Sequence, residues 1–155
     1  MKKLKITPDD FFITFEDQSG TQTGFLDRET GEVLLIMWEI MHEEMEEEAD
    51  RIEEDRERYI RITPISPREG FRIMEEFVET LPDGEERRIL DTVLRGAKPF
   101  RNFKEALFDM GDLREQWFEF HHPALLRLAE EFLSRWNIEP EWISYSEYLK
   151  LRGKA

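Results

Sequence analysis

Cysteine is absent from the 155 residues of this chain, which excludes disulfide bonds, thiol nucleophiles and cysteine-bound metal ions. No stretch approaches the run of about 18 apolar residues that a membrane-spanning helix needs. The chain begins with the basic residues 1–5, and no apolar segment of the kind found in a secretory signal follows them. We therefore expect a cytoplasmic protein that does not interact with a membrane.

The residues on which common catalytic and metal sites are built are also scarce. There are three histidines, and His42 begins a helix signature of zinc proteases in which Glu46 stands where the second histidine is required. No Gly-x-Ser-x-Gly turn and no glycine-rich phosphate loop occurs. The sequence predicts no catalytic residue, no metal site and no cofactor, and it favours a protein that is not an enzyme.

The net charge is −14, and residues 39–58 carry 11 acidic and 3 basic side chains, more than half of the excess. A strongly acidic protein is a poor non-specific binder of nucleic acid, because such binding depends on neutralising phosphates. Apolar residues recur at helical steps through this segment, so we predict an acidic helix over 38–58. Its charged side is a solvated face, a surface for a basic protein partner, or a mimic of nucleic acid. The frequent Glu and Arg, with two Asn, resemble a heat-adapted composition.

The N-terminal part of the chain is predicted to form strands. Segments 11–16, 23–26 and 32–36 are rich in the aromatic and β-branched residues typical of strands. Asp27 and Gly31 suit a bulged hairpin turn between the last two segments. A fourth strand, 59–63, ends at Pro64 and lies either parallel to the third strand or at the far edge. We expect an antiparallel β-meander of three to four strands, preceded by an irregular lead-in.

Helices are predicted from Pro64 onward. Ser66 and Glu69, with Pro67 between them, match a capping box that opens a helix. Further apolar faces predict helices over 85–95, 99–109 and from Asp112, with a break or a bend at Pro123, and helices over 125–136 and 141–151. The predicted fold is a single α+β domain, 1–155, in which about five C-terminal helices of the half 65–155 cover the strands of the half 1–64.

The densest aromatic stretch runs from Pro99 to Phe120. Its rings fall at helical spacing, which is typical of core residues, while Arg101 and Lys104 lie on the other side of the first helix. An alternative is that these two cations flank an aromatic platform for a base or an anionic ligand. The candidate ligand-binding residues on this second interpretation are Arg101, Phe103, Lys104, Trp117 and His121.

An ordered set of signatures resembles a known family. These are Phe25-Leu26-Asp27, Thr30-Gly31-Glu32-Val33, the strand ending at Pro64, Phe100–Leu107 and Trp117–Phe120. Together they resemble the bacterial uncharacterised protein family 0158 over residues 11–143, with departures at Asn102 and Phe118. The resemblance supports the outline of the domain and implies no catalytic residue.

Two classes of function therefore stay open. The first is a non-catalytic interaction or regulatory protein, whose basic protein partner binds the acidic helix or the aromatic and basic helix 99–109. The second is a small-molecule-binding protein or small enzyme with a pocket near Arg101, Lys104, Trp117 and His121. Nucleic-acid binding, confined to Arg101 and Lys104, is the weakest alternative, and the sequence predicts no oligomeric state.

Overall fold

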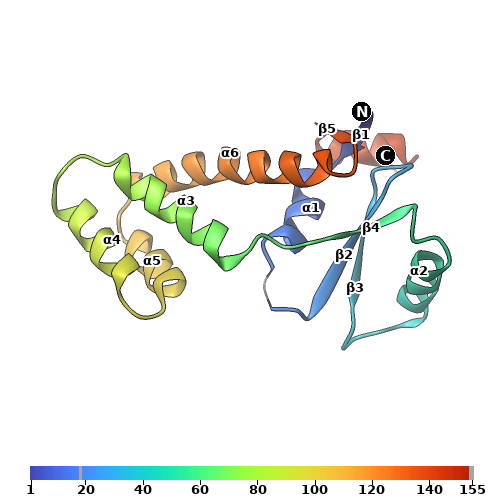
Figure 1. Ribbon diagram of the computed structural model, residues 1–155, viewed down its shortest axis with the longest axis horizontal. Coiled ribbons are helices and arrows are strands. Elements are labelled where there is room, and N and C mark those ends of the chain that lie inside the picture. The colour runs from blue at the N-terminus through green and yellow to red at the C-terminus, as the bar shows by residue number, and fades with distance from the viewer. Residues whose placement is uncertain (18, 154–155) are drawn as a thin grey trace. The chain divides into compact units, whose positions relative to one another are not determined.

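The computed structural model describes residues 1–17 and 19–153, and within them it has seven helices and two sheets (Figure 1). The predicted α+β class is confirmed. The elements, in chain order, are β1 (Lys2–Ile6), α1 (Pro8–Phe15), β2 (Gln22–Asp27), β3 (Val33–Met37), α2 (Glu43–Glu54), β4 (Tyr59–Ile62), α3 (Pro67–Glu79), α4 (Glu85–Arg95), α5 (Pro99–Phe108), α6 (Asp112–Ser134), β5 (Ile138–Trp142) and α7 (Tyr145–Leu151).

The chain separates into two compact units. Unit 1 comprises Met1–Ile65 and Ala129–Ala155, and unit 2 comprises Ser66–Leu128. Within the described residues, every strand lies in unit 1, and unit 2 is helical. That the whole chain forms a single domain stays a prediction.

The three-stranded sheet of unit 1 has the order β3-β2-β4, and both neighbours run antiparallel to β2. The segment 59–63 thus lies at the far edge, one of its two predicted positions. The predicted turn between β2 and β3 is confirmed: Gly31 has φ 80°, and Asp27 Oδ1 accepts the amide N–H of Glu29 at 2.9 Å. Both features act within five residues, which is why the sequence alone predicts them.

The predicted strand at 11–16 is wrong, because residues 11–15 belong to helix α1 and Glu16 is its C-cap. Pro8 occupies the first turn, where its fixed φ favours a helix, and two acidic residues there suit the positive end of the helix dipole. Phe11 and Phe15, one turn apart, then contact each other with ring centroids 5.2 Å apart. The aromatic run that resembles a strand is the buried face of a short helix.

Both ends of the chain also differ from prediction. The expected lead-in contains β1, which pairs in parallel with β5, so that Lys2 lies opposite Ile138 and Ile6 opposite Trp142. The last helix was expected over 141–151, but it begins at Tyr145, because the residues before Ile143 belong to the strand pair. A pairing between segments so far apart in sequence leaves no local signal.

The sheet packs against helices that are close to it in sequence, whereas the later helices were predicted to cover it. Thr14 of α1 lies against Gly24 of β2 so closely that a Cβ atom added to Gly24 would overlap its side chain. On the α2 side, Met45 and Ile52 pack with Ile36. Helix α2 is shorter than the predicted 38–58, because the chain is extended at His42 and α2 ends at Glu54.

Unit 2 follows the predicted helical pattern closely. The capping box of α3 is confirmed, since Ser66 Oγ accepts the Glu69 N–H at 3.1 Å and Glu69 Oε1 accepts the Ser66 N–H at 3.1 Å. Of the predicted break or bend at Pro123, the break is wrong, because α6 continues through this residue. Proline inside a helix costs roughly 3 kcal/mol, and burial of Trp117 and Leu125 on the flanking turns offsets that cost. Among the described residues, no helix has both the length and the apolarity to cross a membrane.

Candidate functional site

The five residues predicted to bind a ligand lie on α5 and α6 in unit 2. Phe103 is fully buried and Trp117 is 7% exposed, and their rings meet edge to face with centroids 5.0 Å apart. Phe77 of α3 also contacts Trp117, at 5.3 Å between centroids. Edge-to-face pairs of this kind add roughly 0.5–1.5 kcal/mol to what burial contributes. Phe103 and Trp117 therefore form part of the core of unit 2.

His121 continues this aromatic row at its partly exposed end. Its imidazole stacks on the Trp117 ring, with centroids 4.7 Å apart and the planes inclined by 24°. Burial, with smaller contributions from the charges of Lys104 and His122, lowers the pKa of His121 from 6.5 to about 4. The imidazole is thus neutral near pH 7 and cannot hold an anion by charge.

Arg101 and Lys104 lie on the exposed side of α5. Arg101 Nε donates to Glu105 Oε1 at 3.1 Å, one helical turn away, and both side chains are largely exposed. Exposed pairs of this type contribute at most about 1 kcal/mol. The structure thus brings Phe103, Trp117 and His121 together, with Lys104 near His121, and pairs Arg101 with Glu105. The hollows described below, all within residues 1–17 and 19–153, are lined by other side chains.

The lowered pKa of His121 predicts a pH dependence of stability. Between pH 6.5 and 4 the unfolded chain binds the proton and the folded chain does not, so stability falls as the pH falls through this range and the loss levels off below pH 4. Discounted for partial exposure, the loss is about 1–2 kcal/mol. Urea unfolding at a series of pH values measures the free energy of unfolding. This free energy should change less steeply with pH for His121→Gln than for the wild type. Equal slopes in the two proteins would contradict the burial of His121.

A second aromatic cluster in unit 2 is exposed. The Arg114 guanidinium lies 5.3 Å from the ring centroid of Phe108 and 5.5 Å from that of Phe118. Phe108 is 68% exposed and Phe118 is 49% exposed. The i, i+4 spacing of Arg114 and Phe118 could have predicted half of this cluster, and Phe108 comes from the preceding helix.

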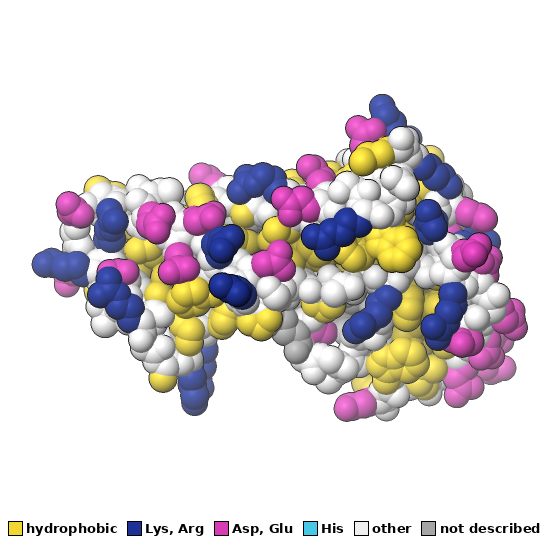
Figure 2. Space-filling model, viewed as in Figure 1, with side chains coloured by type: hydrophobic (Ala, Val, Ile, Leu, Met, Phe, Trp, Pro, Cys, Tyr) yellow, Lys and Arg dark blue, Asp and Glu magenta, His cyan; other side chains and the backbone are white. Residues whose placement is uncertain are grey.

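Unit 1 carries a surface groove that we call the sheet groove. Its volume is about 590 Å³, and it lies over the sheet face that α2 covers in part. Figure 2 shows hydrophobic side chains on this face of unit 1 with Lys or Arg side chains beside them. Sequence reasoning missed the groove, because its residues come from separate segments of the chain. They are Thr23, Phe25, Ile36, Trp38, Ala49, Ile52, Glu53, Arg56, Tyr59, Ile60, Arg61, Thr63 and Trp136.

A partly buried ion pair lies beside this groove. Arg58 donates from Nε to Asp27 Oδ1 at 3.0 Å and from Nη2 to Oδ2 at 2.9 Å, and its guanidinium lies 5.3 Å from the Tyr59 ring centroid. Burial alone would raise the pKa of Asp27, but hydrogen bonds from Arg58, Glu29 and Thr30 outweigh it, so the pKa is lowered. The pair links the turn after β2 to the start of β4.

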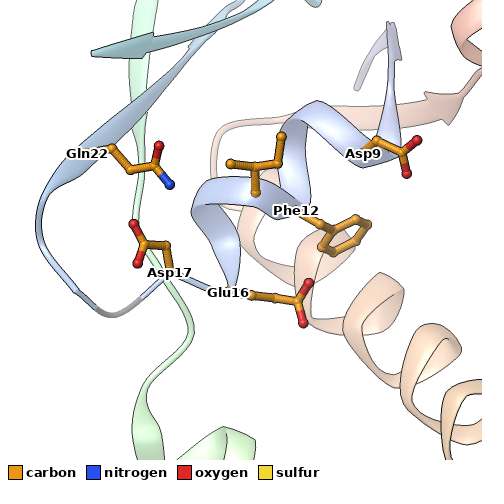
Figure 3. A pocket seen from close by; sticks show the side chains of 6 residues that line it. Asp9, Phe12, Glu16, Asp17 and Gln22 are labelled. Atoms are coloured by element: carbon orange, nitrogen blue, oxygen red, sulfur yellow. The ribbon is translucent and has the colours of Figure 1, made fainter. Parts of the chain in front are cut away.

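A second hollow lies between α1 and the start of β2 (Figure 3). Its volume is about 550 Å³, and Asp9, Glu16 and Asp17 contribute carboxylates to its lining. Hydrogen bonds from the side chain and the amide of Ser19 lower the pKa of Asp17. The described residues contain no group of three or more acidic or histidine side chains arranged to hold a metal ion.

Comparison with known proteins identifies relatives without an assigned reaction. The model of an uncharacterised protein family (UPF0158) matches residues 9–152. A protein of Pseudomonas aeruginosa that carries the same family name is 28% identical over 116 residues, which cover 75% of this chain and 74% of that protein. No solved structure matches this chain.

Proposed function

Since the chain belongs to the uncharacterised protein family 0158, we propose its function from its surface: it is a non-catalytic binding protein whose helix α2 receives a basic protein partner. The observation that carries this proposal is that α2 is amphipathic, with one apolar face that is buried and an acidic surface that is exposed. Met45 and Ile52 are its buried residues, and they fasten the helix to the sheet. The remaining faces present carboxylates to solvent.

The charge on α2 is poorly compensated. Exposed acids occupy seven of its twelve positions, and Arg51 is its one basic residue. Among the described residues, the ion pair of this helix is Glu53 with Arg56, at 2.7 Å. Acidic side chains gather over α2 in Figure 2. A concentrated field of one sign steers a partner of opposite charge and raises its rate of association.

A second candidate surface is the exposed end of the aromatic and basic helix α5. Phe108 of α5 forms an accessible cluster there with Arg114 and Phe118 of α6. Aromatic and arginine side chains are the residues enriched at binding hot spots. The alternative of a small-molecule pocket near Arg101, Lys104, Trp117 and His121 stays a prediction. The burial of Trp117 and the Arg101–Glu105 pair leave it with less support than α2.

Charge neutralisation tests the role of α2. The variant carries Glu43→Gln, Glu47→Gln, Asp50→Asn and Glu54→Gln, all at exposed positions. Binding of a fluorescent nonalysine peptide at low salt is measured for this variant and for the wild type. We expect binding to weaken by about tenfold or more, because the loss of local charge removes most of the electrostatic attraction.

The matched control carries four Glu→Gln changes at exposed positions of unit 2: Glu75, Glu76, Glu79 and Glu86. It loses the same number of negative charges, but none of them from α2. We therefore expect its affinity for the peptide to change by about twofold or less. Equal weakening in the two variants would show that the peptide responds to net charge alone, and the proposed surface would then be rejected.

A further inference from the structure

We propose that the sheet groove binds a nucleotide, with the base stacked on its aromatic side chains and the phosphate held by arginine. The groove belongs to unit 1, and its lining contains none of the five residues predicted from the sequence. The proposal does not depend on a protein partner for α2.

The groove offers flat aromatic surfaces from several elements. Phe25 lies on β2 and Tyr59 on β4. Trp38 directly follows β3, and Trp136 lies just after α6. Trp38 is 51% exposed and Trp136 is 41% exposed, so parts of both indole rings are open to a ligand. Stacking of a base on an aromatic side chain contributes about 1–3 kcal/mol, and it tolerates any base.

Both tryptophans are held in place before a ligand arrives. The Trp38 indole Nε1 donates to Thr23 Oγ1 at 2.9 Å. The Arg28 guanidinium lies 5.8 Å from the Trp136 ring centroid. Rings that are already oriented lose less conformational entropy on binding, and this favours a stacked ligand.

The groove also places cations where a phosphate could reach them. Arg61 lies opposite Phe25 in the pairing of β4 with β2, so both side chains project from the same face of the sheet. Among the described residues, the exposed Arg61 side chain makes no ion pair and no hydrogen bond. Arg56 also lines the groove and pairs with Glu53 at an exposed position, where a phosphate could compete for it.

Size and charge favour a short ligand over a long nucleic acid. The groove volume of about 590 Å³ lies within the range of small-molecule sites. Acidic α2 forms one wall, through Ala49, Ile52 and Glu53, and the net charge is −14. Each additional phosphate beyond the arginines would meet that negative field. The shared chemistry is one base with its phosphate, either a free nucleotide or the terminal nucleotide of a single strand.

Binding to the full chain tests the proposal directly. The probes are AMP, UMP, ribose 5-phosphate and a single-stranded hexauridylate, measured by calorimetry at low salt. We expect AMP or UMP to bind at least about tenfold more tightly than ribose 5-phosphate, because the sugar phosphate has no base to stack. Tighter binding of the hexamer than of UMP assigns the site to the end of a strand, and the reverse assigns it to a free nucleotide.

Two exposed residues provide the variants. Arg61→Ala and Trp38→Ala should each weaken nucleotide binding by about tenfold, whereas Arg101→Ala in unit 2 should leave it unchanged. Unchanged urea unfolding midpoints would show that the variants fold normally. If an alanine variant does not fold, Arg61→Lys or Trp38→Phe replaces it in the binding measurement. Absence of binding by every probe would overturn the proposal. Binding that both groove variants leave unchanged would overturn it as well.

Discussion

Replacing Phe103 with alanine is expected to lower the free energy of unfolding by about 3–5 kcal/mol, the largest effect that we predict for unit 2. The Phe103 ring is fully buried and contacts the edge of Trp117, so its removal leaves a cavity and takes away an aromatic contact. Urea unfolding monitored by circular dichroism measures this change. Because native proteins have a free energy of unfolding of about 5–15 kcal/mol, the substitution should remove a large part of the stability of unit 2.

Phe100→Ala is the matched control, since Phe100 lies one turn earlier on α5 and is 38% exposed. Its loss should cost about 1 kcal/mol or less. Phe103→Leu should fall between the two, because it keeps most of the apolar volume. Near-normal stability of Phe103→Ala would mean that the ring is not part of a packed core, and would favour its predicted role in ligand binding.

Asp27→Ala is expected to cost about 2–4 kcal/mol at pH 7, the largest effect predicted for unit 1. The Asp27 carboxylate accepts two hydrogen bonds from Arg58 and two from the amides of Glu29 and Thr30. Its removal leaves these donors without their acceptor at a buried position. Urea unfolding of the variant and of the wild type at pH 7 measures the difference.

The effect of Asp27→Ala should depend on pH in a defined direction. The folded pKa of Asp27 is lowered, so its contribution is fully present above the unfolded pKa of about 3.9 and is lost as the pH falls through the folded value. The deficit of the variant should therefore shrink in acid. Glu29→Ala removes the exposed partner of Arg58, so it should cost less than about 1 kcal/mol at any pH. A deficit that is the same at acid and neutral pH would exclude a charged Asp27–Arg58 pair.

The sequence by itself determined the features whose interactions close within one or two turns of the chain. The capping box at Ser66, Pro67 and Glu69 and the hairpin turn at Asp27 and Gly31 occur as predicted, because every partner lies within a few residues. Helices over 67–79, 85–95 and 99–108 follow from apolar spacing, since one face of each is buried.

Of the predicted site, helical spacing indicated that Phe103 and Trp117 share an apolar surface, and the structure places both rings in the core of unit 2. Helical spacing did not indicate that Arg101 pairs with Glu105, nor that His121 stacks on Trp117. Side-chain spacing determines which residues share a helix face. The environment of each side chain, and hence its charge state, depends on the elements packed against it.

The tertiary structure decided what depends on distant partners. Residues 11–15 lie in a helix whose Phe11 packs against Trp142 and Phe132, and β1 exists through its pairing with β5, more than 130 residues away. The sheet groove likewise joins Phe25, Trp38, Arg61 and Trp136 from separate segments. Short aromatic runs satisfy helix and strand patterns equally well, so the contacts that bury them determine which one forms.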